Sequence, residues 1–168
     1  GYLNRGGKMI GSFGAANPAA AADDVLRGAH ANGVKDLRIG VIYGDDVFDH
    51  VLDQDLELPE MGVTAREISE KVVAANAYIG ADPIMDLLDE GAQFILGGRL
   101  ADPSLFVAPI AYEMDWELDD WEKMGTATMI AHQGESEIGS GPLSYQDFSG
   151  SAYGIFEHNL EFLFTEVS

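Results

Sequence analysis

The chain has 168 residues, of which 29 are acidic and nine basic, so its formal net charge is −20. Because such an excess of acid repels phosphate backbones and anionic lipid surfaces, we expect no nucleic-acid partner and no membrane partner. A hydrophobic fraction of 46% predicts a folded domain, and the absence of cysteine excludes disulfides, thiolate metal sites and a cysteine nucleophile.

Location and salt tolerance are the two other properties that composition addresses. The sequence contains no run of 18 apolar residues, and residues 1–8 do not have the apolar core of a secretory signal. We therefore expect a cytoplasmic location. An acidic surface with four lysines fits either adaptation to high salt or an ordinary acidic domain. The salt hypothesis predicts that stability rises as salt is raised toward molar levels.

The first half of the chain alternates predicted strands and helices. In chain order they are a strand at 8–13, a helix at 18–32, a strand at 37–43, a short helix at 47–52, an acidic loop at 53–62, a helical turn at 64–70 and a strand at 72–78. Gly33 is expected to stop the first helix in the left-handed conformation.

Three of the predicted helices open on an Asn-Pro or Asp-Pro pair, namely Asn17-Pro18, Asp82-Pro83 and Asp102-Pro103. In each pair the first side chain fits the N-cap, where it accepts a bond from an orphan backbone N–H. Proline fits the next position because no donor is needed there. The helix from Pro83 carries an apolar stripe at helical spacing, and a strand at 93–96 follows it.

The second half is predicted to be mainly helical at first. The helix from Pro103 contains Pro109, which should kink it or end its first segment. An acidic turn at 115–122 leads to a helix at 126–135. Residues 139–156 are rich in glycine, serine and aromatics and fit a lid, a docking surface or an ordinary loop, while residues 160–167 predict a final strand.

Alternating strands and helices with short connections predict an α/β fold, with a mostly parallel sheet and helices on both faces. We expect one domain over residues 1–168. Both ends of the chain lie beside a predicted apolar strand, so the sheet is expected to be incomplete at both ends. The chain would then be a fragment of a longer protein, or a subunit that a partner completes in a homo- or hetero-oligomer.

Four segments of the sequence occur in a recognisable order: Gly14-Ala15-Ala16-Asn17-Pro18, Gly44-Asp45-Asp46, residues 75–84 (ANAYIGADPI) and residues 98–105 (GRLADPSL). In this order and wording they resemble the acyclic terpene utilisation (AtuA-like) family. The long third segment followed by Gly-Arg-x-Ala-Asp-Pro is the most specific part. This resemblance covers the central portion, residues 8–135, and implies an α/β protein of acyl or terpenoid catabolism acting on small carboxylates or acyl thioesters.

The residues that follow the predicted strand at 93–96 suggest a site for an anion. In an α/β sheet, ligands bind outside the carboxyl ends of the strands, and Arg99 is placed there. Glycines at 97 and 98 let backbone approach a ligand, and a guanidinium binds carboxylate or phosphate with two bonds. Gly98, Arg99 and Asp102 are therefore candidate substrate-binding residues. Alternatively, Arg99 pairs with Asp102 or Asp82 and only ties the strand ends together.

Other polar residues close or follow predicted strands and are expected at the same edge: Asn17, Asp45, Asp46 and Asn76. Asp45 and Asp46 are candidates for a general base or for oxygen ligands of a divalent cation. Ordinary turn chemistry is the alternative for both, and helix capping is the favoured role of Asn17. Tyr78 is a candidate for orienting a substrate oxygen, or it is a half-buried strand tyrosine.

One weak candidate for a metal or acid–base pair lies later in the chain. His132 and Glu135 are three residues apart, a spacing that puts two side chains on one helix face, although a surface pair is the alternative. The sequence contains no Walker loop, no H-E-x-x-H and no G-x-S-x-G. Residues 11–14 do not match G-x-G-x-x-G, so no nucleotide cofactor is expected.

The function expected from these residues is that of a lyase- or hydratase-like enzyme subunit acting on an anionic small molecule. Arg99 would hold the anionic group, and Asp45, Asp46 or His132 would move a proton. The competing class is a non-catalytic ligand-binding or assembly subunit that uses the same edge. A purely structural subunit would instead fill the cleft at the strand ends with aromatic side chains.

Overall fold

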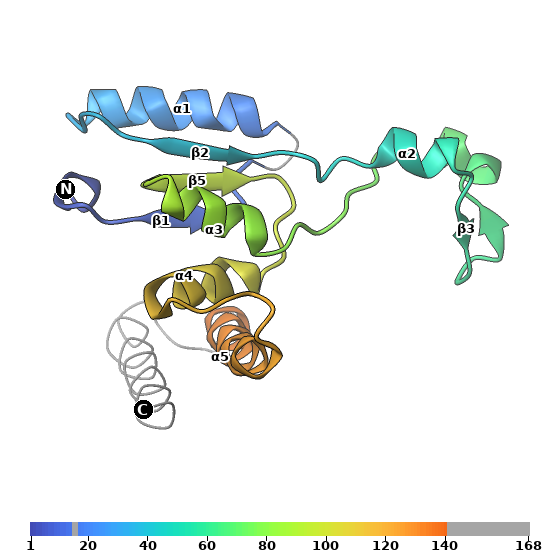
Figure 1. Cartoon of the computed structure of the whole chain (residues 1–168). Helices are drawn as coiled ribbons and strands as arrows, with labels where there is room; N and C mark the ends of the chain where they lie inside the picture. Colours follow the sequence, from blue (N-terminus) through green and yellow to red (C-terminus); the bar gives the residue numbers. More distant parts are fainter. Residues whose placement is uncertain (15–16, 141–168) are drawn as a thin grey trace. The chain divides into compact units, whose positions relative to one another are not determined.

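The structure of the chain, a computed structural model, describes residues 1–14 and 17–140, with side chains through residue 132 (Figure 1). The chain divides between Ala101 and Asp102 into two compact units. Most of the predicted loop at 139–156 and the whole predicted strand at 160–167 lie outside the described residues.

The first unit is built on a three-stranded parallel sheet in the order β1-β5-β2. The strands are β1 (Met9–Gly11), β2 (Ile39–Ile42) and β5 (Phe94–Gly97). Phe94 stands opposite both Met9 and Ile39, so the three strands start in register. The predicted parallel α/β fold is confirmed. Because all three strands run the same way, their carboxyl ends meet at one edge of the sheet.

Two helices, α1 (Pro18–Ala31) and α3 (Asp82–Asp89), cover this sheet (Figure 1). The connection through α1 runs from β1 past β5 to β2, and the connection through α3 runs back from β2 to β5. Right-handed crossovers in opposite directions put their helices on opposite faces. On the α3 face, Gly40 of β2 leaves room for Leu87, since a β-carbon at Gly40 would lie 2.7 Å from Leu87 Cδ1.

The core of the first unit is centred on β5, all four residues of which are buried. A strand that is covered on both faces reads as a continuous apolar run rather than an alternating one, as Phe94-Ile95-Leu96 does. The largest fully buried side chains are Ile84, Leu88, Ile95, Leu96 and Leu100. Ile84 and Leu88 of this set belong to the apolar stripe predicted for the helix from Pro83, so that prediction is confirmed.

Between β2 and α3 the chain forms α2 (Phe48–Asp53), a hairpin of β3 (Glu57–Leu58) and β4 (Val63–Thr64), and the 3-10 helix η2 (Arg66–Lys71). The hairpin was not predicted, because strands of two residues are too short to show a period. Arg66 joins it to α2: its side chain donates to the carbonyls of Leu52 and Asp53, at 3.0 and 2.9 Å.

The strand predicted at residues 72–78 is wrong. This segment is an extended connection outside the sheet, with an isolated antiparallel bridge between Asn76 and Asp46. Its backbone bonds run to the turn beyond β2, from Val47 N–H to the Ala75 carbonyl and from Ala77 N–H to the Asp45 carbonyl. A short apolar run has no feature that distinguishes a sheet strand from such a connection.

The predicted helix caps are confirmed at one of three sites. Asn17 Oδ1 accepts from Ala20 N–H at 3.0 Å, and Gly33 ends the helix region at φ +70°. The other two predictions are wrong, because α3 is capped by Ala81 and α4 (Ser104–Met114) by Pro103, neither with a side-chain bond. Both capping residues have α-helical backbone angles, whereas a capping side chain needs an extended residue at the N-cap.

The second unit is described over α4 and α5 (Trp121–Ser140), which pack against each other. Four alanines are fully buried, two on each helix, and their small size allows close packing: Ala108, Ala111, Ala127 and Ala131. Pro109 lies inside α4 and does not end it. The helix predicted at 126–135 is part of α5. Across the residues that the structure describes, no helix has both the length and the apolar character needed to cross a membrane.

Candidate functional site

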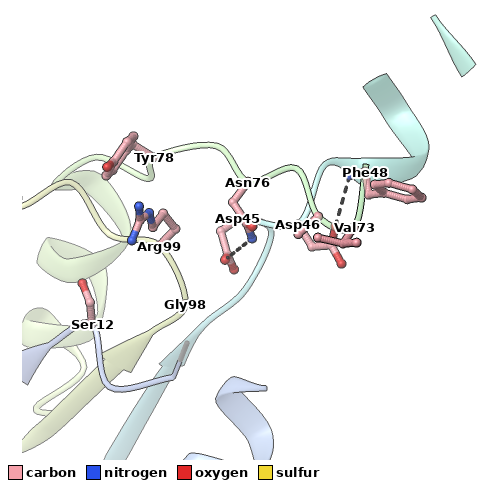
Figure 2. Close-up of a pocket in the computed structure, with 10 residues that line it drawn as sticks. Ser12, Asp45, Asp46, Phe48, Val73, Asn76, Tyr78, Gly98 and Arg99 are labelled. Atoms are coloured by element: carbon pink, nitrogen blue, oxygen red, sulfur yellow. Dashed lines mark hydrogen bonds between the residues drawn. The ribbon is translucent and has the colours of Figure 1, made fainter. Parts of the chain in front are cut away.

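The carboxyl ends of the three strands open on a cavity of about 700 Å³ in the first unit (Figure 2). Each strand contributes residues that follow its last position: Ser12 after β1, Asp45 and Asp46 after β2, and Gly98 and Arg99 after β5. The connection at 72–78 and α2 complete the lining with Phe48, Val73, Ala74, Asn76 and Tyr78. A purely structural subunit was expected to fill this cleft with aromatic side chains. The cleft is instead open.

Asp45 is the buried acid of this cavity, with 5% of its surface exposed. Asn76 Nδ2 donates to Asp45 Oδ2 at 3.0 Å, and the Asp45 backbone carbonyl accepts from Ala77 N–H at 2.7 Å. Side chain and backbone are therefore both held by the connection at 72–78. A carboxylate with one hydrogen-bonded oxygen and a fixed orientation is suited to accept a proton from a bound molecule.

Gly98 makes room for that carboxylate. A β-carbon at Gly98 would overlap both carboxylate oxygens of Asp45, and a β-carbon at Gly97 would lie 2.7 Å from Leu100 Cδ2. The two glycines were expected to allow backbone to approach a ligand. In the structure, the absence of a side chain at Gly97 makes room for Leu100 in the core. The absence of a side chain at Gly98 makes room for the Asp45 carboxylate in the cavity.

Arg99 is exposed, and its guanidinium lies over the ring of Tyr78, 5.1 Å from the ring centroid. Backbone bonding aligns the two segments, since Ile79 N–H donates to the Arg99 carbonyl at 3.0 Å. Among the described residues of the first unit Arg99 forms no ion pair, so the alternative of pairing with Asp82 is not supported. The guanidinium thus brings a positive charge to a cavity that Asp45 and Asp46 also line, and neither carboxylate forms an ion pair with it.

Asp46 differs from its neighbour Asp45. It is exposed, and its Oδ1 accepts from Phe48 N–H at 3.1 Å, a local turn that leads into α2. The turn chemistry that sequence offered as an alternative for both aspartates therefore describes Asp46. Of the two, Asp45 is the one held by a distant side chain, so it is the better candidate for a proton carrier.

The match to protein-family models comes from the same part of the chain. Residues 2–136 match the family described as acyclic terpene utilisation family protein AtuA. The chain belongs to the AtuA family. The resemblance noted in its sequence is thereby confirmed, and every residue that lines the cavity lies within the matched range. Comparison with curated proteins and with solved structures gave no match.

Not all predicted site residues of this AtuA-family chain line the cavity. Asn17 caps α1 and is not among the lining residues. Asp102 and His132 belong to the second unit, where His132 is exposed on α5. Glu135 is also on α5, but its side chain is outside the described part. Within that part, no group of three or more His, Cys, Asp or Glu side chains could hold a metal ion, so a divalent metal stays a prediction.

Four lining residues were missed from sequence: Ser12, Phe48, Val73 and Ala74. Ser12 directly follows β1, so the strand-end rule that identified Asp45 and Arg99 applies to it equally. The other three had no such signal. Val73 and Ala74 reach the cavity because residues 72–78 run back along the turn beyond β2, and Phe48 reaches it as the first residue of α2.

Proposed function

We propose that this AtuA-family chain is a lyase- or hydratase-like enzyme subunit that acts on a small carboxylate or acyl thioester. Membership of the family points to involvement in acyclic terpene utilisation. The observation that carries the proposal is the pairing of two groups in one cavity: a buried, oriented carboxylate, Asp45, and a cation without an ion pair among the described residues, Arg99. A volume of about 700 Å³ suits a small organic ligand, since such pockets measure about 300–1,000 Å³.

In the proposed reaction Arg99 binds the anionic group of the substrate with two parallel hydrogen bonds. Asp45 accepts a proton from the carbon next to the carbonyl, a double bond forms, and the group on the next carbon leaves with its electron pair. In the hydration direction the water oxygen bonds to that carbon while Asp45 accepts a proton from the water, and Asp45 then gives this proton to the carbon next to the carbonyl, so that one hydroxyl and one hydrogen add across the double bond. Arg99 stabilises the charge that develops on the carbonyl oxygen in both directions.

Asn76 supports this chemistry by holding the Asp45 carboxylate in one orientation through its 3.0 Å bond. The second Asp45 oxygen is then the one that faces a substrate. Asp46 is less suited to the step because its Oδ1 is engaged by Phe48 N–H. His132 belongs to the other unit of the chain.

The test is proton exchange in D₂O. The full chain is incubated with a panel of short carboxylates and their thioesters, and NMR measures deuterium entering next to the carbonyl. We expect Asp45→Asn to lower exchange by about 100-fold, the usual contribution of a general base, with binding retained. Arg99→Ala should abolish binding, and Arg99→Lys should recover part of it because the charge returns without the two-bond geometry.

Two results would contradict the proposal. If the protein binds these anions through Arg99 but catalyses neither exchange nor elimination, the non-catalytic binding subunit is the correct class. If no member of the panel binds, or Arg99→Ala binds as wild type while still folded, Arg99 does not hold the substrate.

A further inference from the structure

Helix α5 has two faces of different character. One face packs against α4 and is buried, since Ala127 and Ala131 have none of their surface exposed. The other face carries two of the most exposed large hydrophobic side chains among the described residues, Trp121 at 80% and Met129 at 67%. An open hollow of about 650 Å³ lies on this side, and we call the six residues that line it the α5 face: Trp121, Met124, Gly125, Thr128, Met129 and His132.

The α5 face has few charges for so acidic a protein. Of the 168 residues 29 are acidic, about one in six. None of the six residues of the α5 face is acidic, and residues 121–132 contain only one acid, Glu122, and one lysine, Lys123. Depletion of charge together with exposed tryptophan and methionine is the composition of an interface core. Two copies that each carry a charge of −20 repel least where they meet through a surface without acids.

The spacing of the α5 face is symmetric about Gly125. Trp121 and Met129 are each four residues from it, or about 6 Å along the helix at a rise of 1.5 Å per residue. If a second α5 crosses antiparallel with a two-fold axis beside Gly125, Trp121 of each copy lies level with Met129 of the other. The same contact then forms twice, as two-fold symmetry requires, and a thioether packs favourably on an aromatic ring.

Gly125 leaves room for this approach. A β-carbon at Gly125 would meet nothing within 4 Å, so no side chain of the described residues fills the space beside it. Two helices normally pack with their axes 8–10 Å apart, and the distance depends on the side chains at the contact. Glycine at the crossing point allows the two backbones to approach closely, which brings the flanking Trp121 and Met129 side chains into reach of their counterparts.

We propose that the α5 face binds the α5 face of a second copy of this chain, with the two helices antiparallel about a two-fold axis beside Gly125. Trp121 is the anchor of the interface, and Met129 of the other copy is its main contact. Because the interface is apolar while each copy is strongly acidic, salt strengthens the dimer by screening the repulsion between the copies. This inference is independent of the cavity at the strand ends and of the reaction proposed for it.

The test measures the mass of the full chain by sedimentation velocity over a range of protein concentrations, at about 0.15 and 1 M salt. We expect a monomer–dimer equilibrium that favours the dimer more at the higher salt, because the screening length falls from about 8 to 3 Å. Trp121→Ala should weaken dimerisation by at least about 30-fold, the loss typical of an aromatic anchor in an interface.

Met61→Ala is the matched control for Met129→Ala. Met61 is almost as exposed as Met129, at 63%, but it belongs to the first unit and is not part of the α5 face. Met129→Ala should therefore weaken dimerisation, whereas Met61→Ala should dimerise as wild type does. Equal loss in the two variants would place the contact elsewhere and overturn the proposal.

Two charge variants test the antiparallel arrangement. Trp121→Arg and Met129→Glu should each abolish the dimer, and both should stay folded because the two side chains are exposed. An equal mixture of the two variants should form a heterodimer. In it the introduced guanidinium and carboxylate are level with each other in one contact, and the other contact keeps its tryptophan and methionine. Absence of this heterodimer would overturn the antiparallel arrangement.

A chain that stays monomeric at every concentration and at both salt levels would also overturn the proposal. Quenching of fluorescence by acrylamide then shows whether the chain covers its own α5 face. Trp116 is only 6% exposed, so quenching reports on Trp121. Shielding of Trp121 in such a monomer would assign the α5 face to residues 141–168 of the same chain, and full quenching would leave the face open to solvent.

Discussion

Asp45 and Gly98 meet in the cavity so closely that a β-carbon on Gly98 would overlap both oxygens of the Asp45 carboxylate. The two residues are far apart in sequence and follow different strands, β2 and β5, which are neighbours in the sheet. The position of the buried acid therefore depends on a missing side chain on the adjoining strand. The geometry of the site therefore depends on which strands are neighbours in the sheet as well as on which residues follow them.

Gly98→Ala should displace the Asp45 carboxylate and lower its proton-transfer activity. A misplacement of the order of 1 Å costs about 100-fold in rate, and we expect a loss of that size in deuterium exchange. Gly125→Ala is the matched control, because a β-carbon at Gly125 meets nothing within 4 Å. Wild-type exchange in a folded Gly98→Ala protein would show that the position of Asp45 is not critical.

Gly40→Ala should destabilise the first unit. The new β-carbon would lie 2.7 Å from Leu87 Cδ1 at the contact of β2 with α3, and overpacking of this kind costs about 1–3 kcal/mol. Gly28→Ala, on α1, should do the reverse by about 0.4–1 kcal/mol, because nothing is within 4 Å and alanine favours the helix. Urea unfolding of both variants measures the difference, and equal midpoints would contradict the packing of α3 on β2.

Asp55 should make the hairpin of β3 and β4 sensitive to acid. The Thr64 hydroxyl and the Arg66 backbone N–H donate to its carboxylate and lower the pKa of Asp55 below its ordinary value of 3.8. A lowered pKa in the folded state means that the stabilisation is present above that ordinary value and is lost as pH falls through the folded pKa. NMR titration should place the Asp55 midpoint below that of an unfolded peptide.

Asp55→Asn is the control for this titration. Asp55 has a positive φ of 48°, a conformation that asparagine also tolerates, so the variant keeps the turn but not the titrating group. Local opening of the hairpin, followed by amide exchange, should then no longer depend on pH between about 2 and 5. The same dependence in both proteins would assign it to another group.

Stability should rise with salt. Nine basic residues cannot neutralise 29 acidic ones, and two ion pairs between described residues, Arg27 with Asp24 and Lys123 with Asp120, are local pairs three residues apart. Raising salt from about 0.01 to 1 M shortens the screening length from about 30 to 3 Å and removes most of the repulsion. Each kcal/mol so gained raises Tm by about 2–4 °C. A Tm that does not change with salt would exclude adaptation to high salt.

The elements that sequence predicted correctly are those with a repeating pattern or a defined stop signal. α1 ends at Ala31 with the left-handed Gly33 two residues later, α3 carries its apolar stripe, and β5 is a continuous apolar run. The segment at 72–78 was predicted wrongly as a strand because its apolar residues have no feature that separates a buried strand from an exposed connection. The hairpin at 57–64 was missed because each of its strands has two residues.

For the site, sequence alone determined which residues could meet. Residues that follow parallel strands share one edge whatever the details of packing, so Asp45, Asp46, Gly98 and Arg99 could be placed together in advance. Only the tertiary structure decided their states: Asp45 is buried and held by Asn76, Asp46 is engaged in a turn, and Arg99 lies over Tyr78 without an ion pair among the described residues. The burial of a side chain and its hydrogen-bond partners depend on segments that are distant in sequence. No local sequence pattern predicts which of these segments will pack against it.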